Sequence, residues 1–332
     1  MHKCHYFYTF ANSYSKSQIK MQVAIIDNIN QFPQFEAQNV FQTKDYMRLF
    51  EHEKGTKVVL FVVSQSSFLL IQPLIINRYY RNLPGKFTSY AVAWREPWRN
   101  PQISDNEAQQ AFVLLNNAIQ QYCRHKALYL EYRHFSENNI YHTLFIPHSK
   151  VSPWYNIYNQ IQPDEDVMLF MTKKKRQQLR QSLAAGVQIE HNPTDEQIVE
   201  WYALLRRLYR RIHRPLPSLQ LFLRLNQSPI GKIILITHKG RVISGCAMLV
   251  FKQNNSQLVY DWYRASIAED IEGIYPSVVS TWSALQYLSN QGGGTFDFMG
   301  AGPQNKPYGV RDFKFKFGGT LTNEYRYRKY LL

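Results

Sequence analysis

Clusters of basic residues are the feature of this sequence whose types and spacing best suit chemistry, namely the recognition of an anionic partner. Five arginines fall within an expected helix at 195–214, and Arg206, Arg210 and Arg214 recur every four residues along it. Like charges at this spacing cost a few tenths of a kcal/mol each, and only Glu200 lies nearby to neutralise them. The stripe therefore indicates an anionic partner, although a solvated helix face explains it without one.

Two further stretches combine basic residues with an apolar pattern. The cluster at 173–180 contains three consecutive lysines and two arginines, and it leads into an expected strand at 187–190. Near the end of the chain, the run Phe296–Gly300 is expected to form a strand. We expect its one aspartate, Asp297, to be buried. The following stretch, 311–317, alternates phenylalanine with lysine and predicts a strand with two distinct faces. An ordinary edge strand with its lysines in water explains the same alternation.

Several common catalytic patterns are absent from the sequence. The ten histidines are scattered without an H-E-x-x-H pattern, so we expect no protein-bound metal. The sequence has no G-x-S-x-G elbow for a serine nucleophile, and the glycines at 300–302 lack the third glycine of a dinucleotide-binding loop. In an acyl-CoA-dependent enzyme the loop at 264–273 would hold a diphosphate, but here it contains three carboxylates. This composition argues against coenzyme A.

The elements that must position these residues occur twice in the same order. In each half a helix is followed by three strands, a second helix and a fourth strand. The first set is expected at 43–53, 57–64, 68–75, 89–94, 107–122 and 127–133. The second set is expected at 195–214, 232–237, 242–251, 257–263, 276–290 and 295–299. Corresponding elements are about 170 residues apart, which predicts two copies of one unit.

The connections within each copy predict how its strands pair. Three strands with short links form antiparallel neighbours, whereas a strand–helix–strand crossover forms parallel ones. We therefore expect an α/β (α+β) protein with two tandem domains, each a mixed, mostly antiparallel sheet with packed helices. This order resembles the acetyltransferase-like (GNAT) architecture. We expect a poorly defined segment at 1–20, folding from about Met21, a first domain at 21–150 and a second at 151–332.

The composition excludes several classes of protein. A chain of 332 residues with 15% aromatic residues and a net charge of +15 is a folded basic protein and not a disordered tail. The longest unbroken apolar runs have six residues, whereas a membrane-spanning helix needs about 20. The three cysteines are widely spaced and odd in number, which fits a reducing compartment. We expect a cytoplasmic protein.

Five motifs together resemble the FemABX family of non-ribosomal peptidyltransferases. They run in the family's order from about residue 40 to the end of the sequence: Phe41-Gln42-Thr43 ahead of Tyr46, Lys175-Arg176 with Arg180 and Gly186-Val187, His213-Arg214-Pro215, Phe296-Asp297 with Gly300, and Phe313-Lys314 with Phe317-Gly318. The resemblance implies two GNAT-like domains and transfer of an amino acid from aminoacyl-tRNA to the amine of a peptidoglycan-precursor-like acceptor. It implies no resident cofactor, with aminoacyl-tRNA or acyl-CoA as a co-substrate.

The resemblance also implies roles for individual residues. Lys314 matches the lysine that stabilises charge developing on the ester carbonyl, and we expect Phe313 beside it in the catalytic site. Arg214 matches the arginine that holds the diphosphate of a nucleotide- or lipid-linked acceptor. The family's second phosphate-binding lysine falls near the Tyr46 helix, where this sequence departs from the family and has an arginine. The substrate-binding candidates besides Arg214 are Arg48, Arg176, Arg180, Tyr263 and Asp297.

The expected partners are an aminoacyl-tRNA donor and a diphosphate-linked peptide acceptor, handled by a monomer that contacts the anionic inner membrane surface. The long charged helical arm of some family members is missing between 171 and 230, so the acceptor need not be a bridge-bearing precursor. Two alternatives stay open. One is an acyl-CoA-dependent N-acyltransferase of the same fold, and the other is a non-catalytic basic protein that binds RNA or a membrane surface.

Overall fold

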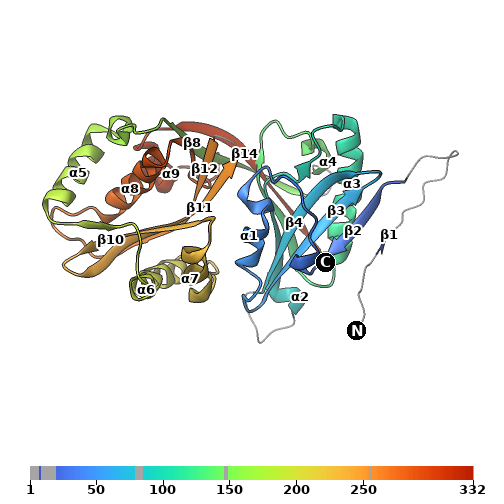
Figure 1. Cartoon of the computed structure of the whole chain (residues 1–332), viewed down its shortest axis with the longest axis horizontal. Coiled ribbons are helices and arrows are strands. Elements are labelled where there is room, and N and C mark those ends of the chain that lie inside the picture. Colours follow the sequence, from blue (N-terminus) through green and yellow to red (C-terminus); the bar gives the residue numbers. More distant parts are fainter. Residues whose placement is uncertain (1–6, 9–19, 79–84, 146–148, 254–255, 332) are drawn as a thin grey trace. The chain divides into compact units, whose positions relative to one another are not determined.

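The chain forms two compact units, which the computed structural model describes over residues 7–8, 20–78, 85–145, 149–253 and 256–331 (Figure 1). Unit 1 comprises Met1–Pro153 and Glu324–Leu332, and unit 2 comprises Trp154–Asn323. The first change of unit thus falls at Pro153, whereas the sequence placed a domain boundary at 150. Residues 324–332, which we assigned to the second domain, lie in unit 1. Most of the segment 1–20 lies outside the described residues.

Unit 1 is a mixed sheet with one long helix and several short ones. Its strands are β1 (Phe7–Tyr8), β2 (Gln22–Ile26), β3 (Thr56–Ser64), β4 (Phe68–Arg78), β5 (Ser89–Trp94), β6 (Trp98–Arg99), β7 (Tyr129–Ser136) and, from Glu324 on, β14 (Thr320–Tyr330). Its helices are η1 (Ile29–Gln31), η2 (Val40–Gln42), α1 (Lys44–Arg48), α2 (Gly85–Thr88), α3 (Asp105–Cys123) and α4 (His142–Phe145). The strand order is β1-β2-β3-β4-β5-β7-β14, and β6 pairs with β4. Only the β5–β7 pair is parallel among these described strands.

Helix α3 begins where its sequence signals place it. Ser104 accepts a hydrogen bond from the Glu107 backbone N–H, and the Glu107 carboxylate accepts one from the Ser104 backbone N–H, which completes a capping box. The helix then buries an apolar face that includes Phe112 and Leu115 against β3 and β4. This packing forms the core of unit 1.

Unit 2 repeats the same design. Its strands are β8 (Lys150–Ile161), β9 (Gln188–Glu190), β10 (Gly231–His238), β11 (Arg241–Gln253), β12 (Ser256–Ser266) and β13 (Gly294–Asp297). Its helices are η3 (Val167–Phe170), α5 (Lys173–Ala184), α6 (Asp195–Arg211), α7 (Leu219–Gln227), α8 (Pro276–Asn290) and α9 (Gly309–Phe315). The strand order is β8-β13-β12-β11-β10-β9, and β12–β13 is the parallel pair among the described strands.

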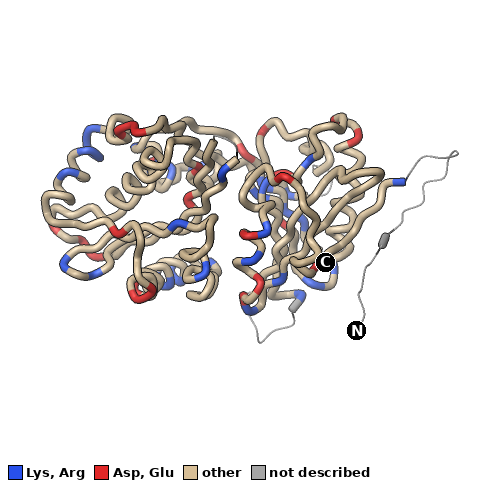
Figure 2. The backbone as a smooth tube through the Cα atoms, in the orientation of Figure 1, with Lys and Arg blue, Asp and Glu red and all other residues tan. Residues whose placement is uncertain are grey.

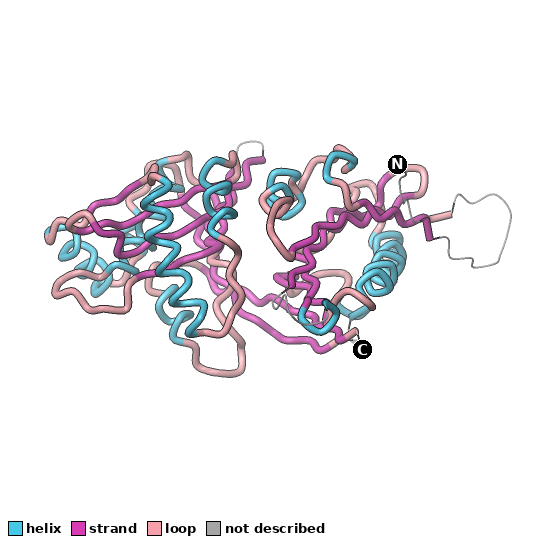
Figure 3. Tube along the Cα trace, turned by 90° about the horizontal axis from the view of Figure 1, so that it is seen from below, coloured by secondary structure: helices cyan, strands magenta, loops and turns pink. Residues whose placement is uncertain are grey.

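Helices cover the sheet of unit 2 on both faces. Along β10, Ile234 and Ile236 lie in the hydrophobic cluster that includes α8, whereas Leu235 points to the other face. There α6 and α7 pack on β10, and α6 also packs on β11 and β12 (Figure 3). A Cβ atom on Gly245 would come within 2.4 Å of Leu235 Cδ2 and 2.9 Å of Trp201 Nε1, so only glycine admits α6 this closely.

The predicted strand pairing is confirmed in both units. Strands β3, β4 and β5 are antiparallel neighbours, as are β10, β11 and β12, and each set is followed by a helix and a parallel strand. Two tandem copies of a mixed, mostly antiparallel sheet with packed helices is therefore the correct fold class. None of the described helices is both long enough and apolar enough to cross a membrane.

The predicted strand at 311–317 is wrong, because helix α9 covers residues 309–315 and a turn follows at 316–317. Phenylalanines two residues apart on a strand share a face, but those four residues apart also meet on a helix. Here the rings of Phe313 and Phe317 lie 5.2 Å apart and pack toward the core, whereas Phe315 is 54% exposed. The alternation of phenylalanine and lysine thus fits a helix as well as a strand. The expected helix at 43–53 is also shorter, since α1 ends at Arg48.

The chain passes from one unit to the other within two strands, β8 and β14. Strand β8 follows β7 in sequence but pairs with β13 of unit 2, and β14 follows β13 but pairs with β7 of unit 1. In this second pairing Tyr327 faces Tyr132, and both side chains are buried. Elements β8, α7 and β14 were not predicted from the sequence.

Candidate active site

The candidate active site lies in unit 2, where the parallel pairing of β12 and β13 stops. Three residue pairs join these strands, and the last of them is Tyr260 with Asp297. Just beyond it, β12 bulges where its register with β11 shifts between Asp261 and Tyr263. Strand β13 ends there in a turn that includes Gly300, whose φ of +101° favours glycine. Bulges are common next to active sites, and the backbone groups beyond the last pair are free to bond side chains or a ligand.

Lys314 on α9 reaches this turn. Its ammonium donates hydrogen bonds to the carbonyl oxygens of Phe298, at 2.7 Å, and Gly300, at 2.8 Å. An ammonium has three N–H donors, and the third has no hydrogen-bond partner among the residues that the structure describes. Burial lowers the pKa of Lys314 to about 8, although the carboxylates of Asp261 and Asp297 act to raise it. The lysine is therefore mostly charged at neutral pH and can donate to a further oxygen.

Asp297 holds the turn that Lys314 binds. It is fully buried, and its Oδ1 accepts hydrogen bonds from Asn156 Nδ2 at 2.8 Å and from the Met299 backbone N–H at 2.7 Å. Asn156 in turn accepts a hydrogen bond at 2.7 Å from the Gly300 backbone N–H. These contacts make Asp297 a residue that positions the carbonyls facing Lys314. Its expected contact with substrate stays a prediction.

A buried ion pair lies beside Lys314 on β12. Arg264 Nη2 donates to Asp261 Oδ1 at 2.9 Å, and Arg264 Nη1 donates to Ser280 Oγ of α8 at 2.5 Å. Residues three apart on a regular strand point to opposite faces. The bulge in β12 lies between Asp261 and Arg264, so both side chains point to the same cluster. Because Asp261 raises the pKa of Lys314 and Arg264 lowers it, the three groups share one local electrostatic field.

Tyr209 on α6 connects this cluster with the predicted anion-binding arginine. Burial raises the pKa of Tyr209, the nearby carboxylate of Asp261 raises it further, and Arg214 opposes both. Arg214 lies just beyond the end of α6, its side chain is exposed, and its backbone N–H donates to the Tyr209 carbonyl at 3.0 Å. The ring of Tyr263, another predicted substrate contact, lies 5.6 Å from that of Tyr209. Arg214 and Tyr263, two of the predicted substrate-binding residues, thus both neighbour Tyr209.

The remaining predicted residues of unit 2 lie on or against α5 and α9. Arg176 Nη1 donates to the Met171 carbonyl at 2.8 Å, and Arg180 is exposed on the same helix. The ring of Phe313 lies under the Lys175 ammonium, 4.9 Å from its centroid, and packs with the hydrophobic core. The structure thus gives Phe313 a packing contact and leaves its catalytic role a prediction.

Arg48 is the one predicted site residue that lies in unit 1. It ends helix α1, and its guanidinium forms an exposed ion pair with Asp45 at 3.5 Å. Pairs of this kind contribute little to stability, so Arg48 remains available to an anion.

Sequence reasoning missed Asn156, Tyr209, Asp261 and Arg264. A signal for Asp261 was present, because one aspartate interrupts an otherwise apolar and aromatic run, 258–263. A charged residue in such a strand is rarely buried without a partner. Arg264 follows three residues later. We expected it in the loop at 264–273, because no pattern in the sequence predicts the bulge that places it beside Asp261.

The corresponding position in unit 1 is closed. Five residue pairs join β5 and β7, from Tyr90–Tyr129 to Trp94–Arg133, and the Arg95 N–H then continues the ladder to the Arg133 carbonyl at 2.8 Å. The parallel ladder therefore extends further in unit 1 than in unit 2, where it stops at Tyr260–Asp297 and side chains bond the backbone beyond it. This difference assigns the candidate active site to unit 2.

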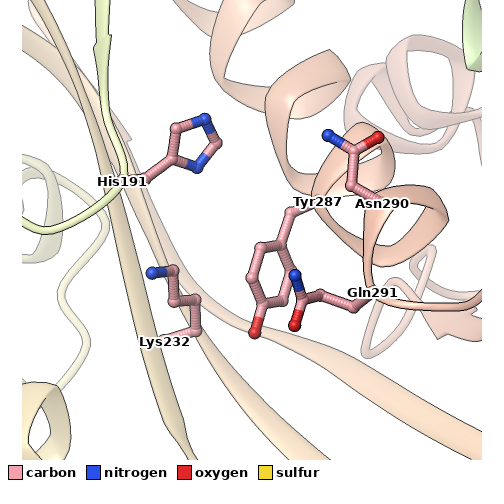
Figure 4. A pocket seen from close by; sticks show the side chains of 5 residues that line it. All are labelled: His191, Lys232, Tyr287, Asn290 and Gln291. Atoms are coloured by element: carbon pink, nitrogen blue, oxygen red, sulfur yellow. The ribbon is translucent and has the colours of Figure 1, made fainter.

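A separate cavity of about 240 Å³ lies at the other end of α8 (Figure 4). It is lined by His191, Lys232, Tyr287, Asn290 and Gln291. Ser280, which bonds Arg264, precedes Gln291 by eleven residues, or about 16 Å of helix. The Lys232 ammonium donates to Asn192 Oδ1 at 3.1 Å. The cavity contains none of the predicted site residues and is distinct from the candidate active site.

Comparison with protein-family models gives no match, and comparison with curated protein sequences gives none either. Several solved structures are similar to this chain. The crystal structure of FemX has a TM-score of 0.59 and 12% identity, covering 87% of this chain and 92% of that one. L-PGS from Bacillus licheniformis has a TM-score of 0.55 and 12% identity over 87% and 92% of the two chains. A tandem GNAT protein from the clavulanic acid biosynthesis pathway has a TM-score of 0.55 and 10% identity over 87% and 88%. The expected fold, FemX-like and built from tandem GNAT-like units, is confirmed.

Proposed function

We propose that this protein is a FemX-like aminoacyltransferase that moves an aminoacyl group from aminoacyl-tRNA to the amine of a diphosphate-linked peptide acceptor. One observation carries the proposal: a lysine ammonium with an unused N–H lies at the open end of the β12–β13 ladder. The FemX-like fold supports it, as does the motif match around Lys314.

The proposed reaction needs no nucleophile from the protein. The acceptor amine attacks the ester carbonyl of the donor, a C–N bond forms, and the carbonyl oxygen becomes an oxyanion. The third N–H of Lys314 donates to this oxyanion, an interaction whose loss typically costs about 2.7–4 kcal/mol of transition-state stabilisation. The ester C–O bond then breaks, and the leaving ribose oxygen takes the proton that the amine releases.

Arg214 is the proposed anchor for the acceptor diphosphate. Its guanidinium is exposed and suits two-pronged binding of phosphate oxygens. Tyr209, whose pKa Arg214 lowers and Asp261 raises, neighbours both this arginine and the acidic residue of the cluster. Arg214 would therefore hold the anionic part of a substrate whose amine reacts near Lys314.

An acyl-CoA-dependent N-acyltransferase is the second candidate, and one observation favours it. The three carboxylates of the loop that precedes α8 (Glu269, Asp270 and Glu272) are exposed. Exposed carboxylates can point away from a bound diphosphate, so their presence does not exclude one at this loop. The similarity to a tandem GNAT protein adds support for this candidate.

A donor comparison tests the proposal. The full-length protein is incubated with a uridine-diphosphate-linked muramyl pentapeptide and either tRNA charged with a labelled amino acid or acetyl-CoA, and the products are identified by mass spectrometry. We expect an acceptor that gains one aminoacyl group from tRNA and no acetyl group. Acetylation together with micromolar binding of coenzyme A would overturn the proposal in favour of the second candidate.

A further inference from the structure

Helix α6 exposes four arginines that the proposed transfer chemistry does not use. We call Arg206, Arg207, Arg210 and Arg211 the arginine face. All four side chains are exposed. The buried residues of the helix are Ile198, Trp201, Leu204 and Leu205. At 100° per residue, these four point away from the arginine face, which therefore looks outward from unit 2.

Ion pairs among the described residues do not neutralise the arginine face. None of its four side chains forms an ion pair within the part of the chain that the structure describes. The one carboxylate in the middle of α6, Glu200, accepts a hydrogen bond from the Val242 N–H at 3.0 Å. Arg214 adds a fifth arginine within nine residues, and Figure 2 shows the basic positions of α6 in blue.

Helix geometry explains only part of this cluster. The helix dipole favours cations within the last turn, where Arg210 and Arg211 lie. Arg206 and Arg207 lie before that turn, and each is four residues from another arginine, a spacing at which like charges repel. A folded protein gains nothing from such repulsion, whereas a polyanion bound along the face would relieve it.

We propose that the arginine face binds the phosphate backbone of RNA. The choice of RNA among polyanions rests on the proposed function, in which the donor is attached to RNA. Arginine forks match phosphate oxygens, and the face extends about 7.5 Å along the helix, enough to contact successive phosphates. A membrane surface fits less well, because helices that bind membranes insert an apolar face, and that of α6 is buried in unit 2.

The test compares two variants of the full-length protein, each lacking four positive charges. The first carries R206Q, R207Q, R210Q and R211Q. The second carries K54Q, R124Q, R241Q and K252Q, which are exposed basic positions scattered over other elements. Binding of a fluorescent RNA hairpin is measured by anisotropy from 50 to 300 mM salt. Each lost phosphate contact flattens the plot of log affinity against log salt by about one.

For the first variant we expect a slope that is flatter by three to four and an affinity that is lower by about 100-fold at 0.1 M salt. The scattered variant should keep most of the wild-type slope. Equal losses in both variants would overturn the proposal, because net charge would then explain binding. Tighter binding to phosphatidylglycerol vesicles than to RNA, with the same dependence on the arginine face, would also overturn it.

The outcome is separable from that of the transfer assay. RNA binding is measured without an acyl donor, so it can succeed where aminoacyl transfer fails. Aminoacyl transfer that stays intact in the first variant, with an unchanged salt slope, would contradict the assignment to α6 and leave the proposed function standing. A protein that binds the hairpin through the arginine face and transfers no aminoacyl group would contradict the proposed function alone.

Discussion

Lys314 combines a structural contact with the proposed chemical one. Two of its N–H groups hold the carbonyls of Phe298 and Gly300, which fixes the ammonium at the open end of the ladder. An oxyanion is best stabilised by a donor that needs no reorganisation at the moment of reaction. The two carbonyl contacts supply this fixed position, and the lowered pKa indicates that the ammonium is poorly hydrated.

We predict that transfer slows as the pH rises through about 8. Burial lowers the pKa of Lys314 to about 8, so the charged form that donates to the oxyanion is lost above this pH. The measurement is kcat/KM against pH for wild type and Lys314→Arg, whose guanidinium stays charged. We expect the alkaline decline in wild type alone. A rate that keeps rising with pH in wild type would contradict the role, since it would reflect only deprotonation of the acceptor amine.

At the scale of elements, the sheet of unit 1 depends on a buried ion-pair network between β7 and β14. The Glu131 carboxylate accepts from Arg133 Nε at 2.5 Å and from Arg328 Nη2 at 2.5 Å, and it is 1% exposed. Burial acts to raise the pKa of Glu131, but these arginines outweigh it and lower the pKa to about 2. The network thus joins strands that are nearly 200 residues apart in sequence.

We predict that Glu131→Gln lowers the free energy of unfolding by about 1.5–3 kcal/mol, because Arg133 and Arg328, which are partly exposed, lose charge-assisted hydrogen bonds. A carboxyl whose pKa is lowered by folding adds stability above its unfolded pKa of about 4.5 and loses it as the pH falls toward 2. Urea unfolding at pH 7 and pH 3 measures both effects. The exposed control Glu51→Gln should change stability by less than about 0.5 kcal/mol.

Local signals in the sequence were sufficient for much of the fold. The capping boxes at Ser104 and Thr194 locate the starts of α3 and α6, and link lengths predict which strands are parallel. The alternation at 311–317 failed because phenylalanines four residues apart also share a helix face. The pairing of β14 with β7 could not be predicted, since no local pattern specifies a partner strand so far away in sequence.

The sequence predicted some residues of the candidate site, Asp297 among them, and missed others. Lys314 and Arg214 were found through motifs, which carry residue types at fixed local spacings. Asp261 and Arg264 depend on a bulge, and Tyr209 depends on packing between α6 and β12. Such relations arise from the tertiary structure and leave little trace in one sequence.

At the scale of the whole molecule, unit 1 is completed by the C-terminal strand of the chain. The end of β14 belongs to unit 1, where Tyr327 is fully buried, stacks on Phe145 at 3.9 Å and bonds His142 through its hydroxyl at 2.7 Å. A substitution near the C-terminus should therefore destabilise unit 1, most of which comes from the N-terminal half of the sequence.

We predict that Tyr327→Ala lowers the free energy of unfolding by about 3–5 kcal/mol, the usual cost of deleting a large buried aromatic side chain. Hydrogen exchange should lose protection in β7 and keep it in β10 to β12. Tyr330→Ala on the same strand is the matched control, because Tyr330 is 52% exposed. Equal loss of protection in both units would show that β14 does not belong mainly to unit 1.

The most direct test of the account is the single-turnover rate of aminoacyl transfer from charged tRNA in Lys314→Met and in its neighbour Lys316→Met. Lys316 is exposed just beyond α9 and serves as the control. Retained binding of the RNA hairpin and a cooperative melting curve establish that each variant is folded. We predict a rate lower by about 100- to 1,000-fold for Lys314→Met and a rate within twofold of wild type for Lys316→Met. A folded Lys314→Met variant that transfers at the wild-type rate would contradict the central claim.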